Sequence, residues 1–124
     1  MADKNIVKAQ MARRRRRRVR GKVLGTAERP RLTVCKSLNN ITVQVIDDVR
    51  RVTLVGLASN SRAMRETVSE ADTKVAVARK VGAMVGQLAR AKGVESVVFD
   101  RNQNRYHGRI KAVAEGARES GLKF

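Results

Sequence analysis

Six consecutive arginines occupy positions 13–18, and Arg20 and Lys22 follow, each after one uncharged residue. Each guanidinium stays charged at any working pH, and its planar set of N–H donors matches the oxygens of a phosphate group. Like charges this close repel one another and cannot enter an apolar core without partners. The run, Arg13, Arg14, Arg15, Arg16, Arg17 and Arg18 with Arg20 and Lys22, therefore predicts nucleic-acid binding. A solvated basic tail, a nuclear import signal and a spacer stay open as alternatives.

A second group of basic and polar residues lies between positions 101 and 111. It consists of Arg101, Asn102, Asn104, Arg105, Tyr106, His107, Arg109 and Lys111. These residues follow a predicted strand and lead into a predicted helix, and strand carboxyl ends and helix N-termini both favour ligands. We expect a phosphate-binding corner here. The alternative is that Tyr106 and His107 only fasten the helix to the sheet.

Residues that could carry catalysis are scarce. His107 is the only histidine, and no acidic residue stands at metal-binding spacing from it. Cys35 is the only cysteine, so an intrachain disulfide and a cysteine-rich zinc site are excluded, and a reducing compartment fits. No glycine-rich phosphate loop precedes a helix, and the pair Asp47-Asp48 is better explained by a turn than by a cation site. The sequence predicts no enzyme, no cofactor and no metal.

The composition points to a phosphate polymer as partner. The chain has 124 residues, which favours one domain, and a formal net charge of +17, which favours nucleic acid or an anionic membrane. Twelve basic and two acidic residues fall within residues 1–31, and sixteen basic and nine acidic residues fall in the rest. Aromatic residues make up only 2%, which argues against a protein that stacks on successive single-stranded bases. Structured RNA fits better.

The charge distribution divides the chain into a basic N-terminal arm, residues 1–24, and a globular domain, residues 25–124. Residues 1–20 contain no proline or glycine but few large apolar groups, so we expect the arm to be disordered or frayed until it forms a helix on its partner. No apolar run reaches the length of a membrane span, and the start lacks the apolar core of a secretory signal. A mitochondrial presequence is an alternative that the packed arginine run disfavours.

Alternating apolar and polar residues predict three strands, over 31–37, 41–47 and 52–59, joined by short turns into an antiparallel meander. The side chains expected to face the core are Leu32, Val34, Ile41, Val43 and Val45. The opposite face presents small polar groups, and it is either wet or covered by a ligand.

A helix is predicted from a capping box at 69–72 to Lys92, with Gly93 as its end. Its inward stripe is Val75, Ala78, Val81, Val85 and Leu88. Gly82 and Gly86 allow close backbone approach, and we expect them to face the sheet.

A fourth strand over 94–100, reached through that helix, should lie parallel to its neighbour. A last helix should begin at Tyr106 or His107 and end at Gly121. Its inward residues, with those of the terminus that pack back, are Ile110, Val113, Ala114, Ala117, Leu122 and Phe124. The predicted class is α+β, a four-stranded mixed sheet in the order β-β-β-α-β-α with two helices on one face and a basic N-terminal arm.

Several short motifs occur together in one order: residues 25–34, 44–48, 97–101, 106–112 and 117–124, the last ending in Gly-Leu-Lys-Phe. In this respect the chain, from about Arg13 to its end, resembles the family of the eighteenth protein of the bacterial large ribosomal subunit. The resemblance implies a cytoplasmic structural protein that binds 5S rRNA in the central protuberance and also contacts 23S rRNA and neighbouring ribosomal proteins. It implies no membrane and no small-molecule substrate. A general nucleic-acid-compacting protein is the alternative, and an enzyme acting on RNA is a second one.

The resemblance also implies RNA-binding residues. Besides the basic arm from Arg13 to Lys22, these are Arg31, Lys36, Ser37, Arg101, Tyr106, His107 and Arg109. The chain departs from the family pattern where Cys35 and Thr42 replace frequent aromatic residues and where Asn102-Gln103 replaces a glycine pair. We therefore expect fewer aromatic contacts with RNA and a different loop shape after Arg101.

Overall fold

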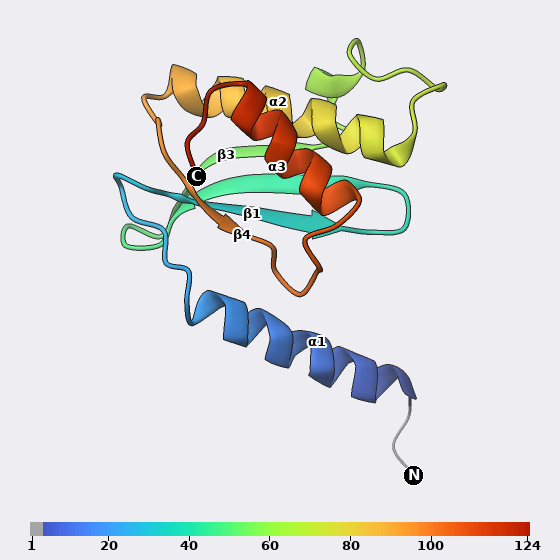
Figure 1. Ribbon diagram of the computed structural model, residues 1–124, viewed down its shortest axis with the longest axis vertical. Coiled ribbons are helices and arrows are strands. Elements are labelled where there is room, and N and C mark those ends of the chain that lie inside the picture. The colour runs from blue at the N-terminus through green and yellow to red at the C-terminus, as the bar shows by residue number, and fades with distance from the viewer. Residues whose placement is uncertain (1–3) are drawn as a thin grey trace.

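The computed structural model describes residues 4–124 and consists of a four-stranded sheet with three α-helices (Figure 1). Residues 1–3, which the sequence assigns to the arm, lie outside the described residues. The elements, in chain order, are α1 (Lys4–Arg20), β1 (Arg31–Lys36), β2 (Ile41–Asp47), β3 (Val52–Ala58), the 3₁₀ turn η1 (Arg62–Met64), α2 (Lys74–Ala91), β4 (Val98–Asp100) and α3 (Arg109–Glu119). The predicted α+β class is confirmed, with α2 and α3 on one face of the sheet.

The sheet has the strand order β3-β2-β1-β4. β2 pairs antiparallel with both β1 and β3, so the predicted meander is confirmed. β4 pairs parallel with β1, with Phe99 beside Leu32, as the helical crossover predicts. The five residues predicted to face the core are all buried, because alternate side chains of a strand point to the same face.

Helix α2 begins later than predicted. Thr73 is its N-cap, and the Thr73 hydroxyl accepts a hydrogen bond from the backbone N–H of Ala76 at 3.2 Å. The predicted helix start at 69–72 is wrong. The Asp72 carboxylate does accept from the Ser69 N–H at 2.9 Å, as in a capping box, but the Ser69 hydroxyl accepts from the Ala71 N–H at 3.2 Å, and these bonds close a local turn before the helix. The predicted end is confirmed: Gly93 has φ = +87°, a left-handed conformation that favours glycine.

The buried stripe of α2 is only partly as predicted. Ala78, Val81 and Val85 are fully buried, but Val75 is 48% and Leu88 is 38% exposed. The prediction failed for these two because α2 packs against α3 as well as the sheet, and the second contact turns the buried side of the helix toward other residues.

Gly82 and Gly86 face α3, which corrects the prediction that they face the sheet. A Cβ at Gly82 would lie 2.2 Å from the carbonyl oxygen of Val113, so only glycine permits this approach. Gly116 of α3 matches it, since a Cβ there would lie 2.1 Å from the Arg79 carbonyl oxygen. The glycines thus fix the close crossing of the two helices.

Strand β4 is shorter than predicted. The residues just before it form backbone hydrogen bonds with the C-terminal segment of the chain and not with β1. The Val97 N–H donates to the Lys123 carbonyl at 3.1 Å, and the Lys123 N–H donates to the backbone carbonyl of Glu95 at 3.0 Å. Helix α3 begins at Arg109, not at Tyr106 or His107, because Gly108 adopts φ = +58° and cannot continue a helix backwards. Its four predicted inward residues are buried, and Gly121 follows its end with φ = +108°.

Candidate nucleic-acid interface

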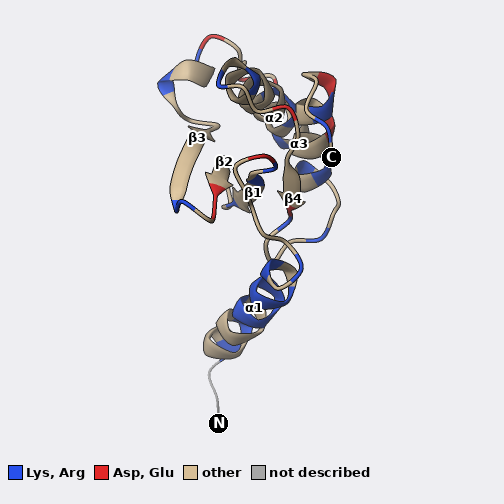
Figure 2. Cartoon of the chain, turned by 90° about the vertical axis from the view of Figure 1, so that its left-hand side faces the viewer, with Lys and Arg blue, Asp and Glu red and all other residues tan. Residues whose placement is uncertain are grey.

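Helix α1 carries the arginine run and projects from the body on the side of the sheet opposite α2 and α3 (Figures 1 and 2). None of its residues is buried. Successive residues of a helix are turned by about 100°, so six consecutive arginines encircle the axis instead of forming one stripe. Every basic residue of the run is exposed except Arg16, which is half-buried. The arm therefore presents positive charge in all directions.

The structure describes the arm as helix α1, and the expectation that the arm is disordered or frayed until it meets its partner stays a prediction. Burial in the core does not hold this helix, because none of its residues is buried. Arg17, Arg18 and Arg20 lie in its last turn, where cations interact favourably with the helix dipole. The helix is stabilised by its own backbone hydrogen bonds and by this dipole interaction.

The arm joins the body at Gly25, which lies against the β2–β3 turn. The Gly25 N–H donates to the Asp48 carboxylate at 2.8 Å, and the Asp48 N–H donates to the Gly25 carbonyl at 3.0 Å. A Cβ at Gly25 would come within 2.5 Å of the backbone of Arg31, so only glycine fits. The chain at Gly25 is thus fixed to the β2–β3 turn.

Arg31, which the resemblance implied to bind RNA, lies with its guanidinium against two carboxylates. Its Nε donates to Asp48 at 2.9 Å and its Nη1 donates to Asp100 at 2.8 Å. The Arg31 side chain is only 8% exposed. The hydrogen bond to Asp48 is the main reason that the pKa of Arg31 is raised, with Asp100 contributing further and burial opposing both. Through these contacts Arg31 links β1 to β4 and to the arm root, by which we mean Gly25 where it is bonded to Asp48.

The same ion pair sets the charge state of Asp48. The hydrogen bond from Arg31 lowers the pKa of the Asp48 carboxyl, the Gly25 N–H lowers it further, and partial burial opposes them. The positive charge of Arg20, at the end of α1, adds a smaller effect in the same direction. Asp48 is therefore ionised at neutral pH and holds the arm root electrostatically.

The β1–β2 hairpin carries Lys36 and Ser37, both exposed. The Ser37 hydroxyl donates to the Asn40 carbonyl at 3.1 Å and accepts from the Asn40 N–H at 3.2 Å, so it shapes the turn. Arg109 donates from Nη2 to the Ser37 carbonyl at 3.0 Å. Two of the predicted site residues, far apart in sequence, are thereby brought together.

At the corner after β4, Arg101 and His107 are exposed and Tyr106 is 42% exposed. The Tyr106 ring packs edge-on against Phe99, with ring centroids 5.9 Å apart, and its hydroxyl accepts from Arg118 at 3.3 Å. Tyr106 thus fastens the corner to the body and still presents part of its ring. Arg101 donates to the Asn104 carbonyl at 2.9 Å, which leaves further donors on its guanidinium.

Asn102 connects the corner to the sheet face that lacks helices. Its side-chain amide donates to Cys35 Sγ at 3.2 Å, and its backbone is left-handed with φ = +59°. Asparagine tolerates this conformation better than most residues. Thr42 and Gln44 are exposed on the same face, as predicted, and beside Cys35 they give it small polar side chains.

Sequence analysis missed Lys74, Asn39 and Asp48 as parts of the surface. Lys74 donates from Nζ to the Leu38 carbonyl at 2.7 Å, which places it beside the hairpin of Lys36 and Ser37. Only the three-dimensional approach of α2 to the hairpin shows this, because 36 residues separate the two partners. Asp48 had been explained by a turn, which is correct but omits its bonds to Gly25 and Arg31.

Within residues 4–124, no group of three or more His, Cys, Asp or Glu side chains is arranged to hold a metal ion. The helices found in that part of the chain include none that is long and apolar enough to cross a membrane.

The fold and this surface define a small basic α+β protein that presents an arginine helix and a polar sheet face. The family model described as ribosomal L18 of archaea, bacteria, mitochondria and chloroplasts matches residues 6–124. The chain belongs to this family, so it is a structural, non-enzymatic component of the large ribosomal subunit, as predicted, and its predicted cytoplasmic location is that of the ribosome.

Similar proteins are named large ribosomal subunit protein uL18. The one from Anaeromyxobacter sp. (strain Fw109-5) is 51% identical over 111 residues, which cover 90% of this chain and 92% of that protein. The one from Clostridioides difficile (strain 630) is 50% identical over 123 residues, covering 99% and 97%. The one from Alkaliphilus oremlandii (strain OhILAs) is 54% identical over 110 residues, covering 89% of each.

Proposed function

We propose that this protein binds 5S rRNA and helps to attach it to 23S rRNA in the central protuberance of the large subunit. The observation that carries the proposal is helix α1, which has no buried residue and whose six consecutive arginines at 13–18 point to all sides of its axis. A helix of this kind gains nothing from its own body and has the charge to lie between several RNA backbones at once. The arm, residues 1–24, and the domain, residues 25–124, are then two separate parts of one RNA-binding surface.

The body contributes its own contacts in this proposal. They come from the hairpin and the corner. The proposed residues are the exposed Lys36, Ser37, Arg101, Tyr106 and His107 and the half-buried Arg109. Arg31 takes the role of a positioning residue, because its bonds to Asp48 and Asp100 direct its guanidinium into the protein. Tyr106 offers a ring edge and face for one base, which fits recognition of an unpaired nucleotide in folded RNA. Neighbouring ribosomal proteins are further proposed partners.

A competition experiment tests the proposal. The full chain is bound to labelled 5S rRNA at physiological salt and challenged with unlabelled 5S rRNA or with tRNA. We expect 5S rRNA to compete at far lower concentration. Equal competition would favour a general nucleic-acid-compacting protein instead.

The salt dependence of the same complex tests the electrostatic part. If about 6–10 phosphates are contacted, the affinity falls by about 10³–10⁵ between 50 and 200 mM salt. A nearly flat response would contradict charge neutralisation as the basis of binding.

A further inference from the structure

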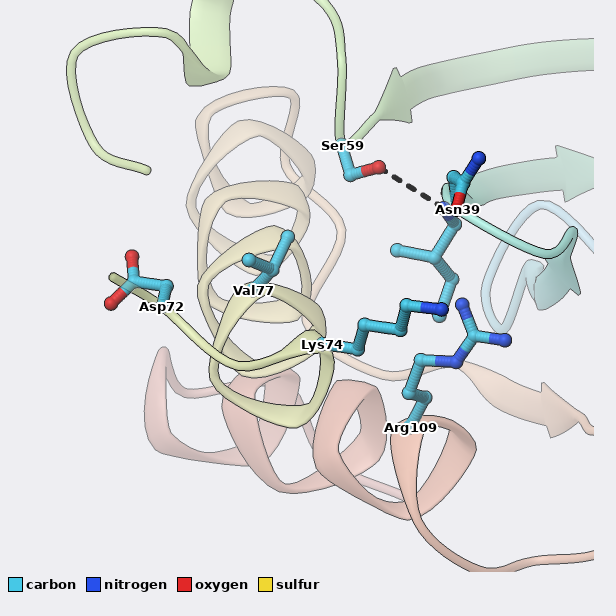
Figure 3. A pocket seen from close by; sticks show the side chains of 7 residues that line it. Asn39, Ser59, Asp72, Lys74, Val77 and Arg109 are labelled. Atoms are coloured by element: carbon cyan, nitrogen blue, oxygen red, sulfur yellow. Dashed lines mark hydrogen bonds between the residues drawn. The ribbon is translucent and has the colours of Figure 1, made fainter. Parts of the chain in front are cut away.

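Two cations from different helices converge on the turn of the β1–β2 hairpin (Figure 3). Lys74, the first residue of α2, donates from Nζ to the Leu38 carbonyl at 2.7 Å. Arg109, the first residue of α3, donates from Nη2 to the Ser37 carbonyl at 3.0 Å. These carbonyls belong to consecutive residues, so the two positive groups are held within one turn of each other.

A cavity of about 170 Å³ opens between these groups. Its lining residues are Asn39, Ile41, Ser59, Asp72, Lys74, Val77 and Arg109. A single water needs only about 10–15 Å³ measured in this way. The space therefore admits a group larger than one water. Five of its seven lining residues have polar or charged side chains, and Ile41 and Val77 supply its apolar part.

No carboxylate neutralises the two cations. Neither takes part in an ion pair within residues 4–124, whereas Arg79 on the same helix α2 lies against both Glu115 and Glu119 of α3. Asp72 lines the cavity, but its carboxylate accepts from Lys80 Nζ at 2.6 Å and from the Ser69 N–H. Figure 3 shows the Asp72 carboxylate pointing away from Arg109. The cavity thus has a net positive charge that an anion would balance.

The cations also keep unused donors. A lysine ammonium has three N–H donors and an arginine guanidinium has five, and each group spends one on a hairpin carbonyl. The remaining donors suit a group with several acceptor oxygens around one centre, and a phosphate is such a group. Asn39 lines the same cavity and adds a polar residue to it.

We propose that Lys74 and Arg109, with Asn39, hold one backbone phosphate of RNA beneath the β1–β2 hairpin. The proposal rests on the proposed RNA-binding function and adds a defined contact on the body, separate from the arm. It assigns Lys74 a role that its position at a helix start does not reveal. It also explains why two like charges are kept together at an end of the fold where no acid pairs with them.

A purely structural role makes a different prediction. If Lys74 and Arg109 only brace the hairpin through its carbonyls, their loss loosens the turn but leaves the number of phosphate contacts unchanged. The number of contacts is measurable as the slope of log affinity against log salt. The salt slope of binding therefore reports a phosphate contact, and the stability of the fold reports bracing of the hairpin.

The experiment uses the full chain with 5S rRNA, and binding is measured from 50 to 200 mM salt. The variants are Lys74→Gln, Arg109→Gln, the double variant and Lys74→Arg. The matched control is Lys92→Gln, because Lys92 follows the other end of α2 and likewise donates to a backbone carbonyl, that of Leu54. Phosphate-ethylation interference on the RNA is read in parallel.

We expect Lys74→Gln and Arg109→Gln each to lower the magnitude of the slope by about one and to weaken binding about tenfold. The double variant should lower the slope no further than either single variant, because both cations share one phosphate. Lys74→Arg and Lys92→Gln should keep the wild-type slope. Ethylation of one phosphate should weaken binding of the wild type by a similar factor of about ten and have no further effect on the double variant.

Unchanged slopes in Lys74→Gln and Arg109→Gln would overturn the phosphate site, as would a drop no larger than that of Lys92→Gln. A lowered unfolding midpoint with unchanged slopes would assign the two residues to bracing alone. Equal binding of 5S rRNA and tRNA by the wild type would refute the proposed function for 5S rRNA. The slopes on either RNA would still decide the phosphate site, and absence of all RNA binding would overturn both proposals.

Discussion

The Asp48 carboxylate accepts a hydrogen bond from the backbone N–H of Gly25 at 2.8 Å, and this contact ties the root of the arginine arm to the β2–β3 turn. The same carboxylate bonds Arg31, which also reaches Asp100 on β4. The arm of this protein therefore departs from a fixed point, although the helix beyond it touches little of the body.

Replacement of Asp48 by Asn should lower the free energy of unfolding. The change removes the charge that faces the buried guanidinium of Arg31 and weakens the bond to Gly25. We expect a loss of about 1–2 kcal/mol, less than for a fully buried pair because the Asp48 side chain is 21% exposed. Urea unfolding monitored by circular dichroism measures it, and Glu28→Gln is the matched control, since Glu28 is exposed and near the arm root. Equal stability of Asp48→Asn and the control would contradict this role.

The pH dependence of stability should report the same carboxylate. The pKa of Asp48 is lowered in the folded state, chiefly by Arg31, so its contribution is fully present above the unfolded-state pKa and is lost as the pH falls through the folded-state pKa. Stability should be level at neutral pH and fall below about pH 5. Asp47 and Asp72, whose pKa values are also lowered, add to the fall. Thermal unfolding of wild type and Asp48→Asn from pH 7 to pH 2.5 measures it, and the variant should lose less. Parallel curves would show that Asp48 takes no part.

The glycines between α2 and α3 give a prediction that opposes helix propensity. Alanine is favoured over glycine in a helix by about 1 kcal/mol, yet a Cβ at Gly82 or Gly116 would lie 2.2 or 2.1 Å from a backbone carbonyl oxygen of the other helix. We expect Gly82→Ala and Gly116→Ala to destabilise the fold by about 1–3 kcal/mol. Gly56→Ala is the control, because the nearest atom to its Cβ would be 4.0 Å away. Stabilisation by either helix substitution would show that the crossing is looser than described.

Deletion of residues 1–20 should leave the body folded while RNA binding is weakened. Helix α1 has no buried residue, so its removal takes nothing from the core. The thermal midpoint of the truncated chain, followed by circular dichroism, should match that of the full chain, with less helical signal. A collapsed body after truncation would refute the division into arm and domain.

The alternation of Leu32, Val34 and their partners on β2 predicts the sheet and its buried face correctly, because period-two burial is a local property of the chain. The prediction of which side of α2 is buried is only partly correct, because Val75 and Leu88 are exposed. Val75 and Leu88 fit the helical period, but the period alone does not say that α3 also contacts this helix, and Gly82 was assigned to the wrong partner for the same reason.

The site shows the same limit. The exposure of Arg13 to Arg18 is predictable from sequence because a run of like charges cannot enter an apolar core, and helix α1 has no buried residue. Arg31 looks equally available in sequence, but two carboxylates from distant segments enclose it. Lys74 gave no signal at all, since its place beside the hairpin depends on how α2 lies across the sheet.

Cross-linking within the assembled large subunit tests the central claim most directly. Purified subunits are irradiated with ultraviolet light and digested, and the nucleotides attached to peptides of residues 4–24 are identified by mass spectrometry. The account predicts that these peptides carry nucleotides of 5S rRNA, with 23S rRNA as a second partner. Peptides of the arm that remain free of RNA, with the body attached only to protein, would contradict it.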